Sequence, residues 1–325
     1  MKILAVDDDY FILELLTMIC ARIGYSKVET ALSGDVALEM MNSADEDFEC
    51  LLLDINMPGM DGIELCEQIR AMPAYRKTPI IMLTAMTEKT YIDSAFRAGA
   101  TDYATKPIDI IELGARLRMA QEVVSARREL AALAAPKNDA PVADEPEKTF
   151  DISDEIQIVG FKELIEYAAL ANYILQLSRS GLVCSQVLAI KIDRIDMIFA
   201  RASRDEFTYA LTEFADTVHD VFGPSGYMMA YAGNGAFVLV SNKATLEPSI
   251  GLEREIQDLL DEKNIEYDNG DPLDIEISIG NPIRPSASKT HRIRKTFDRA
   301  IARAENRRSK KQQEPRPTSF RKIAG

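Results

Sequence analysis

Cysteine is scarce in this sequence, and long apolar runs are absent. The four cysteines lie among apolar neighbours without the spacing of metal ligands, so we interpret Cys20, Cys50, Cys66 and Cys184 as reduced core residues. No apolar run approaches the roughly 20 residues that a membrane-spanning helix needs. The N-terminus turns acidic after four apolar residues, which argues against a signal peptide. We therefore expect a cytoplasmic protein that does not enter a membrane.

Basic residues are fewer than acidic ones. The sequence has 38 Lys and Arg residues against 52 Asp and Glu residues, a formal net charge of −14. This acidity argues against a protein that chiefly binds nucleic acid. Basic residues gather only after His291, and we interpret residues 310–325 as a basic disordered tail rather than as a DNA-binding arm.

The chain length of 325 residues exceeds one ordinary core and predicts two domains. Residues 135–151 contain three prolines and several charges with almost no apolar periodicity, which is typical of a flexible linker. We therefore place a first domain at residues 1–134 and a second at residues 152–309.

In the first domain, five short apolar runs alternate with five amphipathic stretches. The runs are nearly continuous in apolar residues, as expected for strands that are buried on both faces. Strands that alternate with helices in this way predict an α/β fold, in which helices cover both faces of a parallel five-stranded sheet.

The last helix of this domain, expected over 110–133, is unusually long. It carries an apolar stripe at spacings of three, four and seven residues, formed by Leu113, Leu117, Ala120, Val124 and Ala131. The stripe could be a coiled-coil seam that joins two chains into a homodimer, or it could pack on its own domain. The pattern does not distinguish the two.

Polar side chains occur where the strands of the first domain end. Asp7 and Asp8 follow the first strand, Asp54 ends the third, Thr84 follows the fourth and Lys106 follows the fifth. Ligands of such sheets bind outside the carboxyl ends of the strands. Three carboxylates on one edge would repel each other without a divalent cation, and oxygen ligands suit Mg²⁺. A lysine beside them can bind an anion, so the set fits transient aspartyl phosphorylation.

Four segments of this region resemble the receiver domain of two-component response regulators: ILAVDDD, LLLDINMPGMDG, PIIMLTA and DYATKPI. The resemblance extends from residue 1 to about residue 122. It implies a flavodoxin-like (βα)₅ fold and a role in phosphorelay signal transduction. It also implies a partner that donates the phosphoryl group, which would be a cognate histidine kinase or a phosphotransfer protein.

The resemblance assigns roles to the acidic residues. Asp54 would accept the phosphoryl group, Asp8 would bind Mg²⁺ directly, and Asp7 would assist through water. The backbone carbonyl of Asn56 would complete the protein's share of the metal shell, together with Asp54. Asp9 beside them is interpreted instead as a residue of the helix start.

The remaining receiver roles belong to residues of the fourth and fifth strand ends. Thr84 would donate its hydroxyl to a phosphoryl oxygen, and Lys106 would pair with another. Tyr103 would be the switch residue, whose ring moves inward when Thr84 moves. The peptide bond between Lys106 and Pro107 would be cis, a geometry that is accessible at low cost only before proline.

The second domain is expected to be an α+β fold in which helices cross over a mixed sheet, beginning with a long helix over 161–179. Its segments AALANY, LAIKID, ISIGNP and FDRAIARAE occur in the order of motifs in the GGDEF domain of diguanylate cyclases. This region therefore resembles that nucleotide-cyclase-like domain over roughly residues 155–308. The stretch YAGNGAFVLV corresponds to the hairpin that carries the family signature.

The signature itself is degenerate. Gly-Gly-Asp-Glu-Phe becomes the sequence GNGAF at residues 233–237, so Gly235 and Ala236 replace both acids. Asp193 keeps the other metal position, but one carboxylate cannot hold two Mg²⁺ ions against a triphosphate. Glu305 replaces the lysine that faces the phosphates. We therefore predict a pseudoenzyme, a catalytically inactive GGDEF-like output domain that signals through contacts with a downstream protein, which the sequence does not identify.

Two alternatives to this interpretation remain. The chain could be a phosphate-gated protein that binds GTP or cyclic di-GMP, with Arg201 as the guanine-reading candidate at a family position. It could instead be an active diguanylate cyclase with an altered site, which would need a second acidic metal ligand near the turn.

Overall fold

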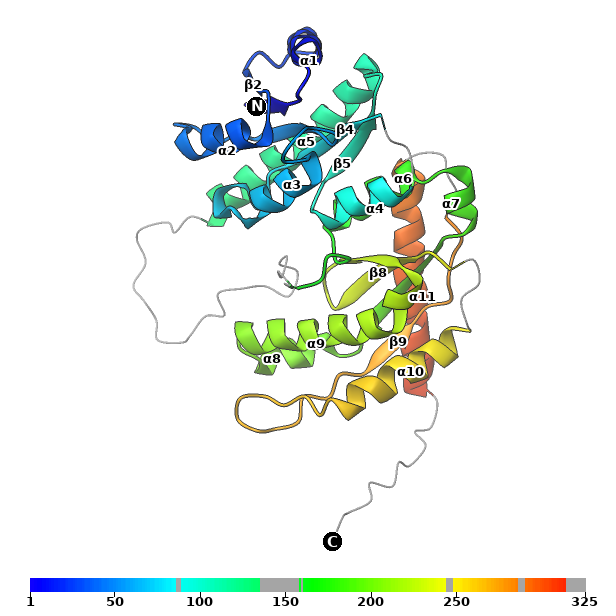
Figure 1. The fold of residues 1–325 in the computed structure, drawn as a ribbon. Coiled ribbons are helices and arrows are strands. Elements are labelled where there is room, and N and C mark those ends of the chain that lie inside the picture. The colour runs from blue at the N-terminus through cyan, green and yellow to red at the C-terminus, as the bar shows by residue number, and fades with distance from the viewer. Residues whose placement is uncertain (86–88, 135–157, 159, 244–247, 286–289, 314–325) are drawn as a thin grey trace, which may run out of the picture. The chain divides into compact units, whose positions relative to one another are not determined.

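The computed structural model shows two compact units (Figure 1). It describes the whole chain except residues 86–88, 135–157, 159, 244–247, 286–289 and 314–325. The first unit contains residues 1–134 and, from beyond the expected linker, Lys162–Ser178. The second unit contains the described residues of 150–161 and those from Arg179 to Gln313. The expected linker at 135–151 lies outside the described residues.

The first unit is built on a parallel five-stranded sheet, which confirms the prediction from the alternating apolar runs. The strand order is β2-β1-β3-β4-β5, and each neighbouring pair runs parallel. The three central strands are buried along their whole length, so their sequences are unbroken apolar runs. The strands are Ile3–Val6 (β1), Val28–Ala31 (β2), Cys50–Asp54 (β3), Ile80–Thr84 (β4) and Asp102–Thr105 (β5).

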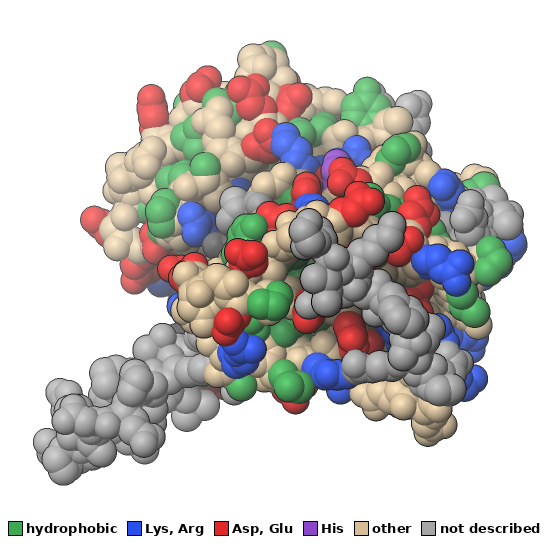
Figure 2. Space-filling view, turned by 90° about the horizontal axis from the view of Figure 1, so that it is seen from below, with side chains coloured by type: hydrophobic (Ala, Val, Ile, Leu, Met, Phe, Trp, Pro, Cys, Tyr) green, Lys and Arg blue, Asp and Glu red, His purple; other side chains and the backbone are tan. Residues whose placement is uncertain are grey.

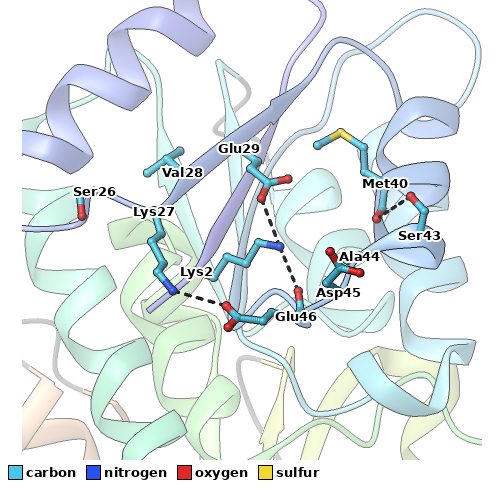
Figure 3. Close-up of a pocket in the computed structure, with 10 residues that line it drawn as sticks. All are labelled: Lys2, Ser26, Lys27, Val28, Glu29, Met40, Ser43, Ala44, Asp45 and Glu46. Atoms are coloured by element: carbon cyan, nitrogen blue, oxygen red, sulfur yellow. Dashed lines mark hydrogen bonds and ion pairs between the residues drawn. The ribbon is translucent and has the colours of Figure 1, made fainter.

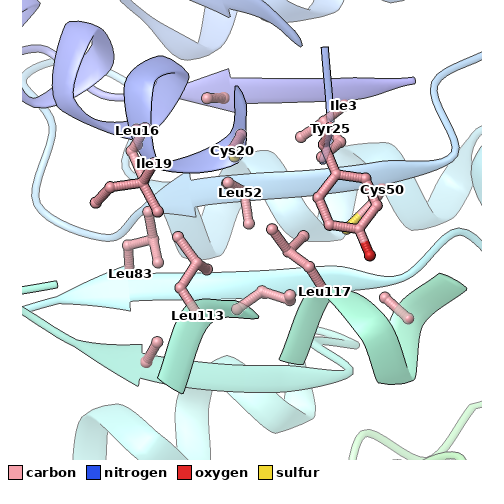
Figure 4. Packing of buried hydrophobic residues seen from close by; sticks show 14 of the residues in the cluster. Ile3, Leu16, Ile19, Cys20, Tyr25, Cys50, Leu52, Leu83, Leu113 and Leu117 are labelled. Atoms are coloured by element: carbon pink, nitrogen blue, oxygen red, sulfur yellow. The ribbon is translucent and has the colours of Figure 1, made fainter. Parts of the chain in front are cut away.

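Helices connect these strands and cover both faces of the sheet, as right-handed crossovers require. The core beneath α1 and α5 is drawn in Figure 4, where Leu16, Leu113 and Leu117 reach toward strand residues such as Leu52 and Leu83. The helices are Tyr10–Arg22 (α1), Gly34–Ser43 (α2), Gly62–Ala71 (α3), Lys89–Arg97 (α4) and Ile110–Ala134 (α5), with a 3₁₀ turn at Pro73–Tyr75 (η1).

The structure shows where the first three positions of the apolar stripe on α5 pack. Leu113, Leu117 and Ala120 are 1%, 0% and 6% exposed and belong to the core that α5 shares with α1 and the sheet. Val124 is half-buried, and the side chain of Ala131 lies outside the described residues. The first three positions of the stripe therefore pack on their own domain and do not form a coiled-coil seam.

One helix that we expected in the second domain belongs to the first unit. The expected helix over 161–179 is shorter, Tyr167–Gln176 (α6), and it contacts α4 and β5. Six consecutive residues of α6 are buried, from Ala169 to Ile174. An apolar helix of this kind needs a surface to cover, but its sequence does not specify which one.

The second unit is an α+β fold around a four-stranded sheet with the order β7-β8-β6-β9. Its strands are Gln186–Ile192 (β6), Tyr227–Tyr231 (β7), Ala236–Ser241 (β8) and Ile277–Ile279 (β9). Its helices are Arg179–Val183 (α7), Ile195–Arg201 (α8), Arg204–Phe222 (α9), Ser249–Glu262 (α10) and Thr290–Gln313 (α11), with a 3₁₀ turn at Gly223–Ser225 (η2). Ser203 and Glu206 form a capping box that fixes the start of α9.

Two expectations for this unit need correction. The sheet is antiparallel rather than mixed, because the β7–β8 hairpin inserts β8 between β6 and β7, the two strands that run in the same direction. The last helix also continues to Gln313, through the first residues of the expected disordered tail. Residues 314–325 of that tail lie outside the described part of the chain.

The cysteines are all free thiols, as expected, but not all of them are core residues. Cys20, Cys50 and Cys66 are buried, whereas Cys184 is exposed directly after α7. Burial raises the pKa of the Cys66 thiol to about 12, so this thiol stays protonated at neutral pH.

The surface carries charges of both signs. On the face drawn in Figure 2, acidic and basic side chains are interspersed with isolated hydrophobic ones. Within the described part of the chain, none of the helices combines the length and the apolar character needed to cross a bilayer.

Candidate functional site

The strand order of the first unit brings three carboxylates together at one edge of the sheet. β1 and β3 are neighbours, with Val6 opposite Leu53, so the residues that follow Val6 and Leu53 emerge side by side. Carboxylate oxygens of Asp7, Asp8 and Asp54 lie within 4.8 Å of one another. The sheet reverses its strand order between β1 and β3, which is where ligands of such folds bind.

The three carboxylates differ in exposure. Asp7 and Asp54 are 1% and 3% exposed, whereas Asp8 is open to solvent. Burial raises the pKa of Asp54 above its ordinary value, although Lys106 and a hydrogen bond from the backbone N–H of Asn56 oppose the rise. A buried carboxylate whose charge is stabilised by one cation is suited to react at its oxygen.

Lys106 lies between the two buried carboxylates. Its Nζ is 2.6 Å from Asp54 Oδ1 and 2.7 Å from Asp7 Oδ2. Burial alone would lower the pKa of Lys106, but the two carboxylates more than offset that effect and raise it. The backbone N–H of Lys106 donates to the Thr84 carbonyl at 2.7 Å, and the Lys106–Pro107 peptide bond is cis, as expected.

Thr84 and Tyr103 lie on the neighbouring strands β4 and β5. They are 0% and 1% exposed. Burial raises the pKa of Tyr103 to about 12, and a hydrogen bond between the side chains of Thr84 and Tyr103 acts in the opposite direction. The ring of Tyr103, which we predicted to be the switch residue, is therefore buried in this structure and is bonded to Thr84.

Two neighbours of the site complete its geometry. Asp9 caps α1 by accepting from the Phe11 N–H at 2.8 Å, which confirms its assignment to the helix start.

Gly62 had not been singled out from the sequence. A Cβ atom at this position would lie 2.0 Å from the carbonyl oxygen of Asp54, so only glycine lets α3 begin this close to the site.

The donor set of this edge fits a magnesium ion. Carboxylate oxygens are the hard ligands that Mg²⁺ prefers, and Mg²⁺ commonly binds through one or two of them while keeping several waters. The cluster of Asp7, Asp8 and Asp54 is typical of the Mg²⁺ site of receiver domains. Among the described residues, it is the only group of three or more His, Cys, Asp or Glu side chains close enough to share an ion. The participation of the Asn56 carbonyl remains a prediction.

An open pocket of about 670 Å³ lies at the opposite edge of the sheet, near the residues that precede β1 and β2 (Figure 3). Four of its five charged side chains are paired with each other, all except Asp45: Lys2 Nζ is 3.1 Å from Glu29 Oε1, and Lys27 Nζ is 3.4 Å from Glu46 Oε2. These pairs leave no converging set of groups for a ligand, so we do not regard the pocket as the functional site.

In the second unit, the candidate metal residue Asp193 directly follows β6 and is 6% exposed. Its Oδ2 accepts from the Ser278 hydroxyl at 2.8 Å. Its Oδ1 is 4.0 Å from Arg308 Nε and finds no hydrogen-bond donor among the described residues. Burial raises the pKa of Asp193, and the Ser278 hydroxyl together with Lys311 and Arg308 opposes this rise.

The GNGAF stretch at residues 233–237 forms the tight hairpin turn that its Asn-Gly pair predicts. Asn234 and Gly235 have φ angles of +52° and +72°, and Tyr231 pairs with Phe237 across the turn. A Cβ atom at Gly235 would lie 2.8 Å from Ile195. Ala236 is 3% exposed and Gly235 is also buried, so neither position faces solvent.

The two remaining candidates of the second unit have partners within the protein. Arg201 donates to Asp271 at 2.8 Å, and its guanidinium lies 4.7 Å from the centre of the Tyr267 ring. Glu305 lies close enough to Lys191 to raise the pKa of that lysine, although burial is the larger effect and leaves it lowered.

Comparison with known proteins identifies the receiver part of the first unit. Residues 3–118 match the family model of the response regulator receiver domain. The transcriptional regulatory protein ResD of Bacillus subtilis is 42% identical over 117 residues, which are 36% of this chain and 46% of ResD. The response regulator PleD of Caulobacter vibrioides is 38% identical over 94 residues, which are 29% of this chain and 20% of PleD.

A similar solved structure is that of the chemotaxis protein CheY4 of Vibrio cholerae. It is 34% identical, with a TM-score of 0.35, and the match covers 37% of this chain and 97% of CheY4. The chain spans about half the length or less of the curated relatives described above.

Proposed function

We propose that this chain, whose residues 3–118 form a response regulator receiver domain, is a phosphorylation-controlled regulator of a two-component system. Asp54 accepts the phosphoryl group, and the second domain is a catalytically inactive GGDEF-like output that acts through protein contacts. The observation that carries the first part is the position of Lys106, 2.6 Å from Asp54 inside a cluster of three carboxylates. The receiver domain implies a cognate histidine kinase as the partner that supplies the phosphoryl group.

The residues at the edge of the sheet supply the nucleophile and the groups that bind the phosphoryl oxygens, and they could hold the Mg²⁺ ion that the transfer needs. An oxygen of Asp54 attacks the phosphorus of a phosphohistidine; the new P–O bond forms as the P–N bond breaks, and the released imidazole takes a proton from solvent. Lys106 can then pair with one phosphoryl oxygen, and the Thr84 hydroxyl can donate to another. Mg²⁺ held by Asp7, Asp8 and Asp54 would supply positive charge that offsets the charge of the phosphoryl group.

Chelation of magnesium should stop the labelling of Asp54. With a radiolabelled small phosphodonor, excess EDTA should lower the initial rate of labelling by about 100-fold or more, because the metal offsets phosphoryl charge. Added MgCl₂ should restore the rate. The Asp8→Asn variant should need a higher magnesium concentration for the same rate, since Asp8 is a proposed ligand that carries no phosphate. Labelling at the normal rate in EDTA would contradict the proposed metal site.

The surroundings of Asp193 support the absence of cyclase activity. Arg308 and Lys311 supply positive charge near its carboxylate, where an active cyclase would need metal ions. The hairpin provides no second carboxylate, because Gly235 and Ala236 stand in its signature positions. The partners of Arg201 favour protein contacts over the alternative of nucleotide recognition, because its guanidinium is already bonded to Asp271.

The purified chain should form no cyclic di-GMP from GTP and Mg²⁺, whether or not Asp54 is phosphorylated. Restoring both acids with Gly235→Asp and Ala236→Glu should not rescue activity. The first change places a Cβ atom 2.8 Å from Ile195 at a φ of +72°, and Glu305 would still repel the phosphates. Chromatography of the reaction products measures turnover, and filtration binding with labelled GTP and cyclic di-GMP tests the nucleotide-binding alternative. Turnover above the level of a heat-denatured sample would refute the proposal that the second domain is catalytically inactive.

A further inference from the structure

The surface formed by α4 and β5 of the receiver unit is covered by a segment of the same chain. We call Lys162–Ser178, which contains α6, the docking segment. α6 contacts α4 and β5 although more than 60 residues separate it from either element in the sequence (Figure 1). β5 is an edge strand that pairs only with β4, so its other side needs protection.

The apolar part of this contact is well defined. Tyr173 of α6 is 0% exposed and packs edge-on against Phe96 of α4, which is also 0% exposed, with 5.5 Å between the ring centres. The Asn172 side chain donates to the carbonyl of Thr101, directly before β5, at 2.9 Å. α6 therefore contacts both the helix and the strand edge.

A polar network fixes the position of Tyr173. Its hydroxyl donates to Asp93 Oδ1 at 2.9 Å, and Lys89 Nζ lies 2.6 Å from Asp93 Oδ2 and 3.1 Å from the Tyr173 oxygen. Burial and the negative charge of Asp93 raise the pKa of Tyr173, so the hydroxyl keeps its proton at neutral pH. Because the buried Tyr173 and the partly exposed Asp93 and Lys89 all bond to one another, the network specifies one position of α6 against α4.

Ion pairs surround the contact on three helices of the receiver. Glu163 pairs with Arg97 of α4 at 3.4 Å, Glu166 with Arg127 of α5 at 3.3 Å, and Lys162 with Glu67 of α3 at 2.5 Å. These partly exposed pairs add little stability each. Their arrangement does match the charges of the docking segment to those of the receiver surface.

The same surface is connected to the phosphorylation site. Thr84 ends β4, and its hydroxyl is hydrogen-bonded to that of Tyr103 in β5, the strand that α6 covers. A Thr84 hydroxyl that gives its one proton to a phosphoryl oxygen cannot also donate to Tyr103, so the bond between the two hydroxyls must then be donated by Tyr103 or break. Lys89, which begins α4 and binds Asp93 and Tyr173, follows Thr84 by only five residues.

We propose that the docking segment is an intramolecular cover of the α4–β5 surface, and that phosphorylation of Asp54 weakens its docking and exposes that surface. The inference rests on the proposed phosphorylation of Asp54. A phosphoryl group that takes the proton of the Thr84 hydroxyl changes the bond between Thr84 and Tyr103, and the resulting shift at the end of β4 would reach α4, on which the Tyr173 network depends. Such couplings typically change an equilibrium by 5- to 150-fold.

Hydrogen–deuterium exchange of the full chain tests the docking itself. In the unphosphorylated protein, Tyr173→Ala should speed exchange of residues 167–176 by about 10-fold or more, because the helix loses its anchor. Asp93→Ala, on the receiver side, should act in the same direction without altering α6. Leu175→Ala is the matched control, since Leu175 lies on α6 but is 37% exposed, and it should stay within about twofold of the wild type. If exchange of residues 167–176 is unchanged in both Tyr173→Ala and Asp93→Ala, the proposed docking of α6 is wrong.

Beryllofluoride with Mg²⁺ tests the control by phosphorylation. It should speed exchange of residues 167–176 about 10-fold in the wild type and leave the Asp54→Ala variant unchanged. Phosphate labelling is measured in parallel to separate the two proposals. If Asp54 is labelled and exchange of α6 stays the same or slows, this inference fails while the proposed function stands. If Asp54 is not labelled, both fail.

Discussion

Replacement of Asp54 by Asn should reduce phosphate labelling of the chain to background. The wild type should take up one phosphoryl group per chain from a small-molecule donor in the presence of Mg²⁺. The Asp54 carboxylate is the nucleophile, it is 3% exposed, and Lys106 lies 2.6 Å away to stabilise the charge. An amide of the same shape fills the same space but has no anionic oxygen to attack phosphorus.

Asp9→Asn is the matched control for this experiment. Asp9 lies beside the site but serves as the cap of α1, and Asn caps a helix about as well as Asp. This variant should be labelled at nearly the wild-type rate. The Lys106→Ala variant keeps the Asp54 carboxylate, so it should still be labelled, but more slowly. Hydrogen–deuterium exchange of α6 in this variant should no longer respond to phosphorylation. Full labelling of the Asp54→Asn protein would refute the assignment of the acceptor.

Leu117→Glu should unfold the receiver unit. Leu117 is 0% exposed in the core that α5 shares with α1 and the sheet, so the substitution loses apolar contacts and buries a charge without a partner. Such defects cost about 4–5 kcal/mol or more, a large part of the roughly 5–15 kcal/mol that stabilises a whole domain. Urea unfolding followed by circular dichroism measures the loss.

Ile111→Glu provides a control on the same helix with the same change of chemistry. Ile111 is 80% exposed, so its substitution should change the free energy of unfolding by no more than about 0.5 kcal/mol. The pair of variants also tests the seam hypothesis for the α5 stripe. A Leu117→Glu protein that is as stable as the wild type but has half its mass in light scattering would support a coiled-coil homodimer and contradict the packing described above.

The acidic site was largely predictable from the sequence. Strand residues buried on both faces are continuous apolar runs, and the polar residues that end them must meet at the carboxyl edge of a parallel sheet. Asp7, Asp54 and Lys106 are therefore brought together by chain topology alone, as the structure shows. The Asn-Gly turn of the second unit was equally local, because positive φ angles at a two-residue turn restrict the residue types.

Only the tertiary structure decided what each apolar surface packs against. The stripe on α5 and the apolar helix α6 are visible as patterns, but a period of 3.6 residues shows that a face is apolar and does not name its partner. The structure places Leu117 in the core of its own domain and seats Tyr173 against Phe96 and Asp93. Position 62 shows the same limit. Only glycine fits there, because a Cβ atom would lie 2.0 Å from the Asp54 carbonyl oxygen, and only the folded chain brings these two residues together. Sequence thus determined the strands, the turn and the reactive edge, whose causes are local or topological, whereas packing between distant segments determined the rest.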